Sequence, residues 1–263
     1  MTGPYRDHRI NAEGIAREAG EVLLAHYGRV EAREKGPADL VTDADIASQH
    51  LITRLLAEAY PDHALLAEEE GAVADPSNPW CWVVDPLDGT MNFAHGFPFW
   101  CVSIGLVHEG REVAGVIYDP LRDVIYSASE GEGTAVDGRP TRVSAVGRMS
   151  NALTTICMPT NFDAVADEQL GLIRRFSGGT HSMRRTGSTA LNLAMVATGA
   201  CEVCYGTAVH PWDVAAGIVL VREAGGAFTA TDSGPYRLSH GGFLASNALV
   251  HAEAAARFAG KAE

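Results

Sequence analysis

Apolar positions recur at two different periods along this chain, and the two periods predict different elements. Residues 10–27 and 46–59 place apolar side chains at helical spacing, and these segments end at Gly28 and before Pro61. One face of each segment is therefore apolar, as in a helix that packs on a core. We predict two amphipathic helices near the N-terminus, joined by a polar connection over residues 31–38.

The middle of the chain has the two-residue period of β-strands. Turn sequences rich in glycine, aspartate and proline separate short apolar segments between residues 100 and 144. Regular turns between short strands are typical of an antiparallel meander. The predicted strands cover residues 101–107, 113–118, 124–128 and 139–143.

The second half of the chain alternates strands with helices. This order predicts an α/β arrangement, in which helices cover the faces of a sheet. Predicted strands lie at residues 153–157, 181–184 and 202–205 and near Phe228 and Phe243. Predicted helices lie at residues 164–176, 189–198 and 213–224 and from Ala248 onward.

The most informative stretch is a buried strand that runs into acidic residues. Residues 80–84 are aromatic and β-branched, and Pro86 cannot donate a ladder hydrogen bond, so we expect the strand to end at Asp85. Asp88 and Gly89 follow, and backbone N–H groups from Gly89 onward would face an anion if they open a helix. Two carboxylates beside an anion indicate metal ions between them. The alternative is a strand followed by an ordinary Asp-Gly turn.

Three further acidic residues stand where strands end or helices begin: Asp45, Glu68 and Asp213. Asp45 and Thr42 are also spaced as a capping box, and Asp213 also suits a helix N-cap. Glu68 lies in an acidic run that a solvated loop would explain equally well. Together with the acidic pair above, these residues lie where loops gather at one rim of an α/β sheet. Oxygen ligands without paired histidine or cysteine select hard cations, and Mg2+ is the usual one beside phosphate.

Composition narrows the classes of partner. The 263 residues carry a formal net charge of −13, which argues against nucleic acid and anionic membrane surfaces as partners. A divalent cation reconciles this charge with an anionic ligand. The N-terminus lacks the apolar segment of a signal peptide, and no apolar run approaches the ~18 residues of a membrane span. The cysteines are odd in number and scattered, so we expect reduced thiols in a cytoplasmic protein, although Cys201 and Cys204 have the spacing of half a zinc site.

Four spaced motifs resemble the inositol monophosphatase family of metal-dependent, lithium-sensitive phosphatases. They are residues 39–45, the Glu68 segment, residues 85–93, and Trp212-Asp213 followed by Gly225-Gly226. The resemblance implies a layered α/β sandwich, commonly a homodimer. It also implies an antiparallel N-terminal portion, residues 1–147, and a C-terminal α/β portion, residues 148–263, in one compact unit with the site between them.

The resemblance further implies a role for each motif residue. Glu68, Asp85 and the Leu87 carbonyl would hold one Mg2+ ion, and Asp85, Asp88 and Asp213 would hold a second. Glu68 would also help to hold a looser third ion. Thr90 with Asp45 would orient the attacking water, and the Gly89 and Thr90 N–H groups would hold phosphate oxygens.

Two departures from the family pattern concern the substrate, a small phosphorylated metabolite. Inositol-specific members carry a glutamate seven positions before the Trp-Asp aspartate, where this chain has Gly206. Ser188 and Thr189 stand where the family has a threonine and an alanine. We therefore expect a more open, less selective leaving-group pocket. Inositol 1-phosphate is the best candidate, histidinol phosphate is the alternative, and a regulatory binding protein with residual phosphatase activity is a hypothesis of another class.

Overall fold

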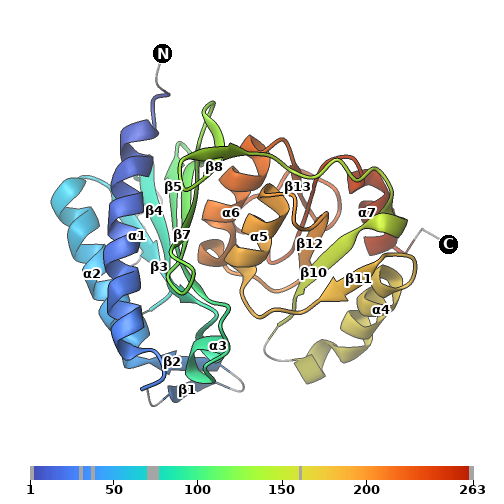
Figure 1. Ribbon diagram of the computed structural model, residues 1–263, viewed down its shortest axis with the longest axis horizontal. Coiled ribbons are helices and arrows are strands. Elements are labelled where there is room, and N and C mark those ends of the chain that lie inside the picture. Colours follow the sequence, from blue (N-terminus) through green and yellow to red (C-terminus); the bar gives the residue numbers. More distant parts are fainter. Residues whose placement is uncertain (1–2, 30–31, 37–38, 70–76, 160–161, 261–263) are drawn as a thin grey trace.

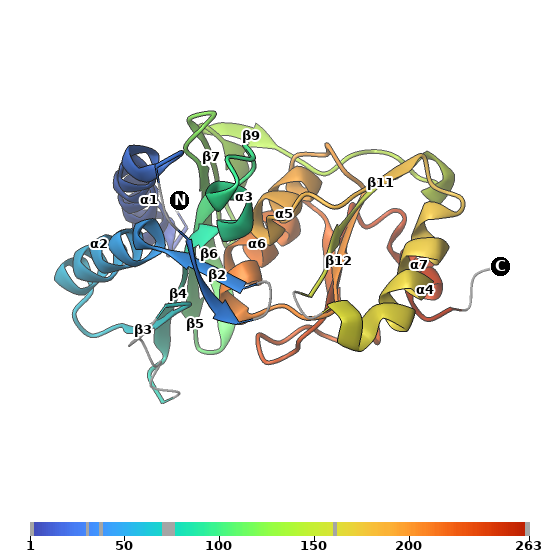
Figure 2. The same ribbon diagram turned by 90° about the horizontal axis from the view of Figure 1, so that it is seen from below.

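The chain folds into alternating layers of helices and sheets (Figures 1 and 2). The computed structural model describes residues 3–29, 32–36, 39–69, 77–159 and 162–260. Helices α1 (Arg6–His26) and α2 (Asp43–Ala59) cover one face of a seven-stranded sheet, and α5 (Thr189–Ala197) and α6 (Pro211–Glu223) lie between it and a five-stranded sheet. Helices α4 (Ala166–Ser177) and α7 (His251–Phe258) cover the outer face of the five-stranded sheet. The expected layered α/β sandwich is confirmed.

The seven-stranded sheet contains the predicted antiparallel meander. Its strand order follows the sequence, and among its described strands only β3 and β4 pair in parallel. The strands are β3 (Ala64–Ala67), β4 (Trp80–Asp88), β5 (Cys101–His108), β6 (Arg111–Asp119), β7 (Val124–Ser129), β8 (Gly133–Val136) and β9 (Arg139–Thr141). Strand β8 was not predicted, because its four residues lie between two glycine turns and give no measurable period.

Strand β4 extends further than predicted. We expected it to end at Asp85, but it continues through Pro86 to Asp88. The register against β5 shifts between Asp85, which pairs with Ser103, and Asp88, which pairs with Cys101. Pro86 and Leu87 on β4 therefore oppose a single residue on β5, Val102, and a proline is tolerated at such a bulge. The bulge keeps both aspartates on the sheet.

The five-stranded sheet confirms the α/β pattern of the second half. Strand β10 (Leu153–Cys157) lies parallel to β11 (Ser182–Arg184) and β12 (Val203–Gly206), while β14 (Phe243–Ser246) is antiparallel to β12 and β13 (Ala227–Ala230). A small antiparallel pair, β1 (Ala32–Gly36) and β2 (Asp39–Thr42), occupies part of the predicted polar connection. The two strands were not predicted, because their polar sequence lacks the apolar alternation of a strand.

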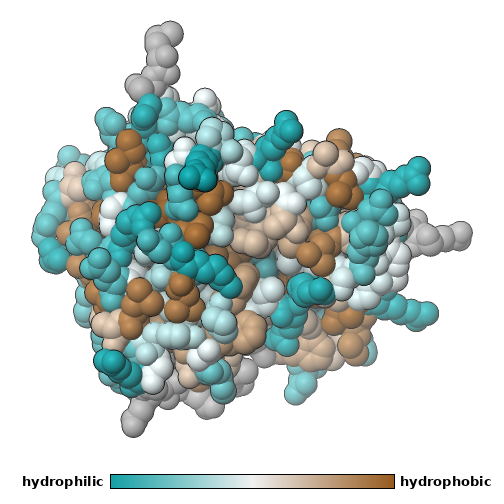
Figure 3. Space-filling view, viewed as in Figure 1, coloured by the Kyte–Doolittle hydropathy of each residue, from teal (hydrophilic) through white to brown (hydrophobic). Residues whose placement is uncertain are grey.

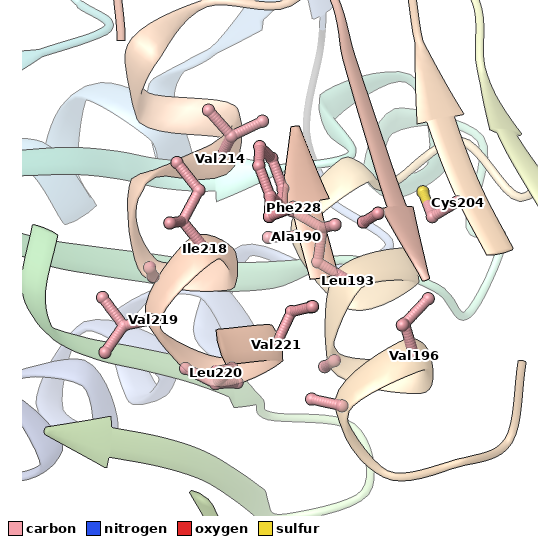
Figure 4. Close-up of a cluster of buried hydrophobic side chains, with 14 of the residues drawn as sticks. Ala190, Leu193, Val196, Cys204, Val214, Ile218, Val219, Leu220, Val221 and Phe228 are labelled. Atoms are coloured by element: carbon pink, nitrogen blue, oxygen red, sulfur yellow. The ribbon is translucent and has the colours of Figure 1, made fainter. Parts of the chain in front are cut away.

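One hydrophobic core joins the two halves of the chain through α6 (Figure 4). A Cβ added at Gly115 of β6 would stand 2.4 Å from the Ala216 carbonyl oxygen, and one at Gly105 would stand 2.8 Å from the Ala215 Cβ. These glycines therefore let α6 lie directly on the sheet. On its other side α6 packs closely against α5, where a Cβ at Gly217 would meet Leu193. The two portions share this core, and the division at residue 147 stays a prediction.

The face of the molecule in Figure 3 has hydrophobic residues interspersed with hydrophilic ones. Over the described residues as a whole, the large exposed apolar side chains are scattered over several elements, as is usual for a protein surface. They include Ile10, Leu24, Met91, Phe97, Leu170 and Leu249. Among the described helices, none is long and apolar enough to cross a membrane.

A stack of aromatic and histidine rings joins the start of α1 to the start of β4. The His63 ring lies 4.9 Å from Trp80, His8 lies 5.2 Å from Trp80, and His108 lies 3.6 Å from it, all nearly parallel. The Nδ1 atoms of His8 and His63 are buried and find no hydrogen-bond partner within the described residues. Burial lowers the pKa of both histidines, and repulsion from His108 adds to the effect, while Asp7 and Asp62 oppose it.

We expect this stack to make folding stability sensitive to acid. Because the folded protein favours neutral His8 and His63, their contribution is complete above the unfolded pKa of about 6.5 and is lost as the pH falls below it. His63→Phe keeps an aromatic ring and removes one titrating group. Thermal melts between about pH 7.5 and 5.5 should therefore show a smaller fall in Tm for His63→Phe than for the wild type. His50→Gln, on the exposed face of α2, is the control, and a fall equal to the wild type's in His63→Phe would contradict the prediction.

Candidate active site

Two buried carboxylates occupy the bulge at the end of β4. Asp85 is 2% exposed and Asp88 is 7% exposed. The Asp85 Oδ1 atom accepts a hydrogen bond of 3.0 Å from the Leu87 N–H, and Ser48 of α2 donates one of 2.9 Å to the Pro86 carbonyl. The bulge is thus fixed both by its own turn and by α2. It places two acids in a largely apolar interior, where an uncompensated charge is costly.

Asp88 connects the two halves of the chain. Its carboxylate accepts hydrogen bonds of 2.6 Å from Ser188 Oγ, 2.6 Å from the Ala190 N–H and 3.2 Å from the Thr189 N–H. These donors form the N-terminus of α5, which favours a negative charge. Ser188 is buried and its oxygen also accepts from the Leu191 N–H. Ser188 is therefore a partner of Asp88 in this structure, whereas the sequence predicted a substrate contact.

Thr90 lies between the end of β4 and the start of α2. Its Oγ1 atom is 3.0 Å from Asp45 Oδ1 and 3.0 Å from the Leu87 carbonyl oxygen. The other Asp45 oxygen, Oδ2, accepts from the Thr42 N–H at 2.8 Å and from the Thr42 hydroxyl at 2.6 Å. Asp45 therefore forms the capping box and the contact to Thr90 at once, with a separate oxygen for each. The capping box is thus present, and the water-orienting role of Thr90 and Asp45 stays a prediction.

Asp213 and Glu68 approach the same region from two other segments. Asp213 is in the first turn of α6, and its Oδ2 accepts from the His210 N–H at 2.8 Å. Glu68 follows β3, where Gln49 of α2 holds the next residue by bonds to the Glu69 N–H and carbonyl. Both residues are partly exposed. The five acidic residues that the sequence singled out therefore lie in α2 (Asp45), directly after β3 (Glu68), in β4 (Asp85 and Asp88) and in α6 (Asp213).

The carboxylates repel one another. Burial raises the pKa of Asp85 well above its ordinary value, and the charges of Glu68, Asp88 and Asp213 raise it further. Burial also raises the pKa of Asp213, with repulsion from Asp88 and Glu68. The pKa of Asp88 is raised by burial and pulled back by its bonds to Ser188 and the α5 N-terminus. The carboxylates of such a cluster stay ionised together only when a cation lies among them.

The donor set fits Mg2+. It consists of carboxylate oxygens and the carbonyl of the buried Leu87, which are the ligands that hard divalent cations prefer. In the part of the chain that the structure describes, no three His, Cys, Asp or Glu side chains form a ready-made metal site. In this structure the Asp88 carboxylate is bonded to α5 and the Asp213 carboxylate to the His210 N–H. We expect both carboxylates to turn toward a bound cation.

Gly89 and Gly206 are both restricted by close neighbours, with different consequences. Gly89 has a φ of +97°, and an added Cβ would stand 3.0 Å from the Phe99 carbonyl oxygen, so glycine is required before α3 (Thr90–Ala94). Gly206 is buried, and an added Cβ would stand 2.8 Å from the Phe243 ring and 3.2 Å from the Cys157 Cβ. Neighbouring side chains therefore fill the space directly beside Gly206, and a more open leaving-group pocket stays a prediction.

The structure adds residues that the sequence did not single out. Asn92 of α3 donates bonds of 2.7 Å to the Phe99 carbonyl and 2.8 Å to the Thr186 carbonyl, which fixes the loop that carries Ser188. Gly187 has a φ of +89° and lies against the Asn92 side chain. The position of Asn92 inside the motif at residues 85–93 was the available signal. Nothing in the local sequence indicated the bond from the Ala190 N–H to Asp88.

This chain is similar to known proteins over nearly its whole length. A model of the inositol monophosphatase family matches residues 6–263. An inositol-1-monophosphatase of Synechocystis sp. is 39% identical over 237 residues, which cover 89% of this chain and 83% of that protein. The Nus factor SuhB of Escherichia coli is 34% identical over 238 residues, which cover 89% of each chain.

A solved structure shows that the similarity extends to the fold. The inositol monophosphatase from Anabaena superposes with a TM-score of 0.90 at 34% identity, and the alignment covers 98% of this chain and 97% of that one. Similarity over this length leaves no large segment of the layered fold unmatched.

Proposed function

This chain belongs to the inositol monophosphatase family and is a phosphoric monoester hydrolase. We propose that it uses Mg2+ ions to hydrolyse a small polyol or sugar-like phosphate, with inositol 1-phosphate as the best substrate. Under this proposal, Glu68, Asp85 and the Leu87 carbonyl hold one ion, and Asp85, Asp88 and Asp213 hold a second. Glu68 also contributes to a third. The proposed homodimer and a cytoplasmic location stay predictions.

The observation that carries the proposal is the arrangement around Thr90. The Thr90 hydroxyl lies between the buried Asp45 carboxylate and the Leu87 carbonyl, a contact that the capping box of Thr42 and Asp45 does not need. When Thr90 donates its proton to Asp45, its oxygen is left as an acceptor for a proton of water. This pair can orient an attacking water beside the Asp85 carboxylate, two residues before Leu87.

The remaining site residues bind and position the phosphate. The Gly89 and Thr90 N–H groups are proposed to hold the nonbridging oxygens, where negative charge is concentrated. When bound, Mg2+ lowers the pKa of the attacking water and stabilises the leaving oxygen. Thr189 is partly exposed beside Asp88 and is proposed to contact the leaving group.

Two observations favour the alternatives. At Gly206 the wall is formed by Phe243, Val209 and Cys157, so the hydroxyl-binding glutamate of inositol-specific members has no counterpart at this position. This favours histidinol phosphate as the second candidate, because a site without the acceptor cannot reject substrates that lack the hydroxyl. The relatives named Nus factor SuhB favour the regulatory hypothesis.

Phosphate release from a panel of substrates tests the proposal. We expect Mg2+-dependent release, abolished by a chelator and restored by added Mg2+, with kcat/KM highest for inositol 1-phosphate among inositol, histidinol, sugar and nucleotide phosphates. A highest value for histidinol phosphate would select the alternative substrate. Release that is negligible for every member at saturating Mg2+ would favour the regulatory hypothesis.

A further inference from the structure

Two cysteine thiols approach each other beside the candidate active site. Cys157 is the last residue of β10, and Cys204 lies on the neighbouring parallel strand β12. Their sulfur atoms are 3.8 Å apart. Cys157 pairs with Gly206 and Cys204 pairs with Thr155, so the two cysteines are offset by two residues along the strands. A disulfide requires about 2.05 Å between sulfurs, so its formation requires β10 and β12 to shift as well as the two side chains to turn.

Cys157 also lies beside Gly206, a position proposed to face the leaving group. Its Sγ accepts from the Asn192 side chain at 3.6 Å, and its Cβ is 3.2 Å from the position that a Cβ at Gly206 would take. The first turn of α5, which contains Asn192 and Thr189, also holds Asp88. A change at Cys157 therefore reaches both the surroundings of Gly206 and the helix that positions a proposed metal ligand.

The environment of Cys157 differs from that of every other cysteine in the chain. Hydrogen bonding from Cys204 lowers the pKa of the Cys157 thiol, with further bonds from Thr189 and Asn192, against the opposing effect of burial. Burial instead raises the pKa of the other four, Cys81, Cys101, Cys201 and Cys204. Cys157 and Cys81 are partly exposed, and the remaining three are buried. Cys81 therefore provides an internal comparison of equal exposure class and opposite thiol character.

We propose that Cys157 and Cys204 form a redox-sensitive pair, in which a hydroperoxide oxidises Cys157 and Cys204 closes a disulfide that shuts down the site. The Cys157 thiolate attacks the peroxide oxygen, which breaks the O–O bond, gives a sulfenic acid and releases water or an alcohol. The Cys204 sulfur then attacks the Cys157 sulfur, the S–O bond breaks and a second water leaves. Two thiols lose two electrons in total, and the peroxide accepts them.

The disulfide lowers activity because it moves residues that position the site. Drawing Cys157 toward Cys204 moves it from Asn192 and Thr189 and shifts the wall at Gly206. A misplacement of about 1 Å at a reacting centre costs on the order of 100-fold in rate. The loss of activity rests on the proposed phosphatase function, whereas formation of the disulfide does not.

The test exposes the full-length protein to hydrogen peroxide and reads thiol chemistry and activity separately. Intact mass and peptide mapping should show loss of two hydrogen atoms and a peptide linked through Cys157 and Cys204. Phosphate release should fall on the order of 10- to 100-fold and return after dithiothreitol. The Cys81→Ser control should behave as the wild type.

Two variants keep the test decisive. Cys204→Ser should stop the reaction at the Cys157 sulfenic acid, which dimedone traps, and Cys157→Ser should remove both the linked peptide and the dithiothreitol-reversible loss. A linked peptide in a protein that shows no phosphatase activity even before oxidation would support the redox-sensitive pair and contradict the proposed function. Faster alkylation or oxidation of Cys81 than of Cys157, or oxidised protein without a Cys157–Cys204 link, would overturn the proposal.

Discussion

Asp213→Asn is expected to lower phosphatase turnover by about 100- to 1000-fold, which corresponds to roughly 2.7–4 kcal/mol of lost transition-state stabilisation. The carboxylate is proposed to hold the ion that stabilises the leaving oxygen, and an amide is a much weaker ligand for Mg2+. The loss should persist at saturating Mg2+, because the missing charge cannot be supplied from solution. Initial rates of phosphate release over a Mg2+ titration measure it.

The same substitution should leave the metal-free protein as stable as the wild type or more stable. The pKa of Asp213 is raised, so its charged form destabilises the fold as the pH rises through that pKa, and asparagine removes this charge. The asparagine Oδ1 can still accept from the His210 N–H. Thermal melts in a chelator should show an unchanged or higher Tm, and near-normal turnover in this variant would contradict the metal assignment.

Asp88→Asn is a poorer test, for a reason that only the structure shows. Asp88 accepts bonds from three donors at the N-terminus of α5, and an asparagine NH2 group would face one of them. We expect this variant to lose stability as well as activity. Asp213→Asn is therefore the substitution that separates metal binding from folding.

The second large effect is expected at Thr90, with Thr42 as its matched control. Both threonines contact Asp45, but Thr90 contacts Oδ1 and Thr42 contacts Oδ2. Thr90→Val should lower turnover by about 10²- to 10⁴-fold, because the water loses its orienting group. Thr42→Ala should cost about 0.5–2 kcal/mol of stability through the lost cap, while the Thr42 N–H still holds Asp45 and turnover stays close to normal.

Initial rates and thermal melts on the two variants decide between catalysis and capping at Asp45. Thr90→Ser keeps the hydroxyl and should retain most of the activity, which shows that the loss in Thr90→Val is not due to packing alone. Equal turnover losses in Thr42→Ala and Thr90→Val, or a Thr90→Val enzyme with normal rates, would refute the water-orienting role.

Much of the fold followed from local patterns. The helices at residues 10–27 and 46–59 and the meander from residue 101 onward have long, regular periods, and the structure confirms them. Features that depend on residues far away in the sequence did not follow from local patterns. The bulge that carries Pro86 exists because β5 continues to pair beyond Asp85, and a single strand sequence does not reveal such a pairing.

The candidate site shows the same division. Asp45, Asp85 and Asp88 could be selected because each stands at the end of an element. The space at Gly206 could not be predicted, because it depends on Phe243, which is 37 residues further along the chain in the neighbouring strand of the sheet. The roles of Ser188 and Ala190 as donors to Asp88 likewise arise from contacts across about 100 residues of sequence.

The most direct test of the account is the position of the metal ions. Crystals grown with Mn2+, which binds the same oxygen ligands as Mg2+ and scatters anomalously, should show at least two peaks that share the Asp85 carboxylate. One peak should also contact Glu68 and the Leu87 carbonyl, and the other should contact Asp88 and Asp213. Anomalous maps without a peak at Asp85, with Asp88 still bonded only to Ser188 and α5, would contradict the proposed metal site.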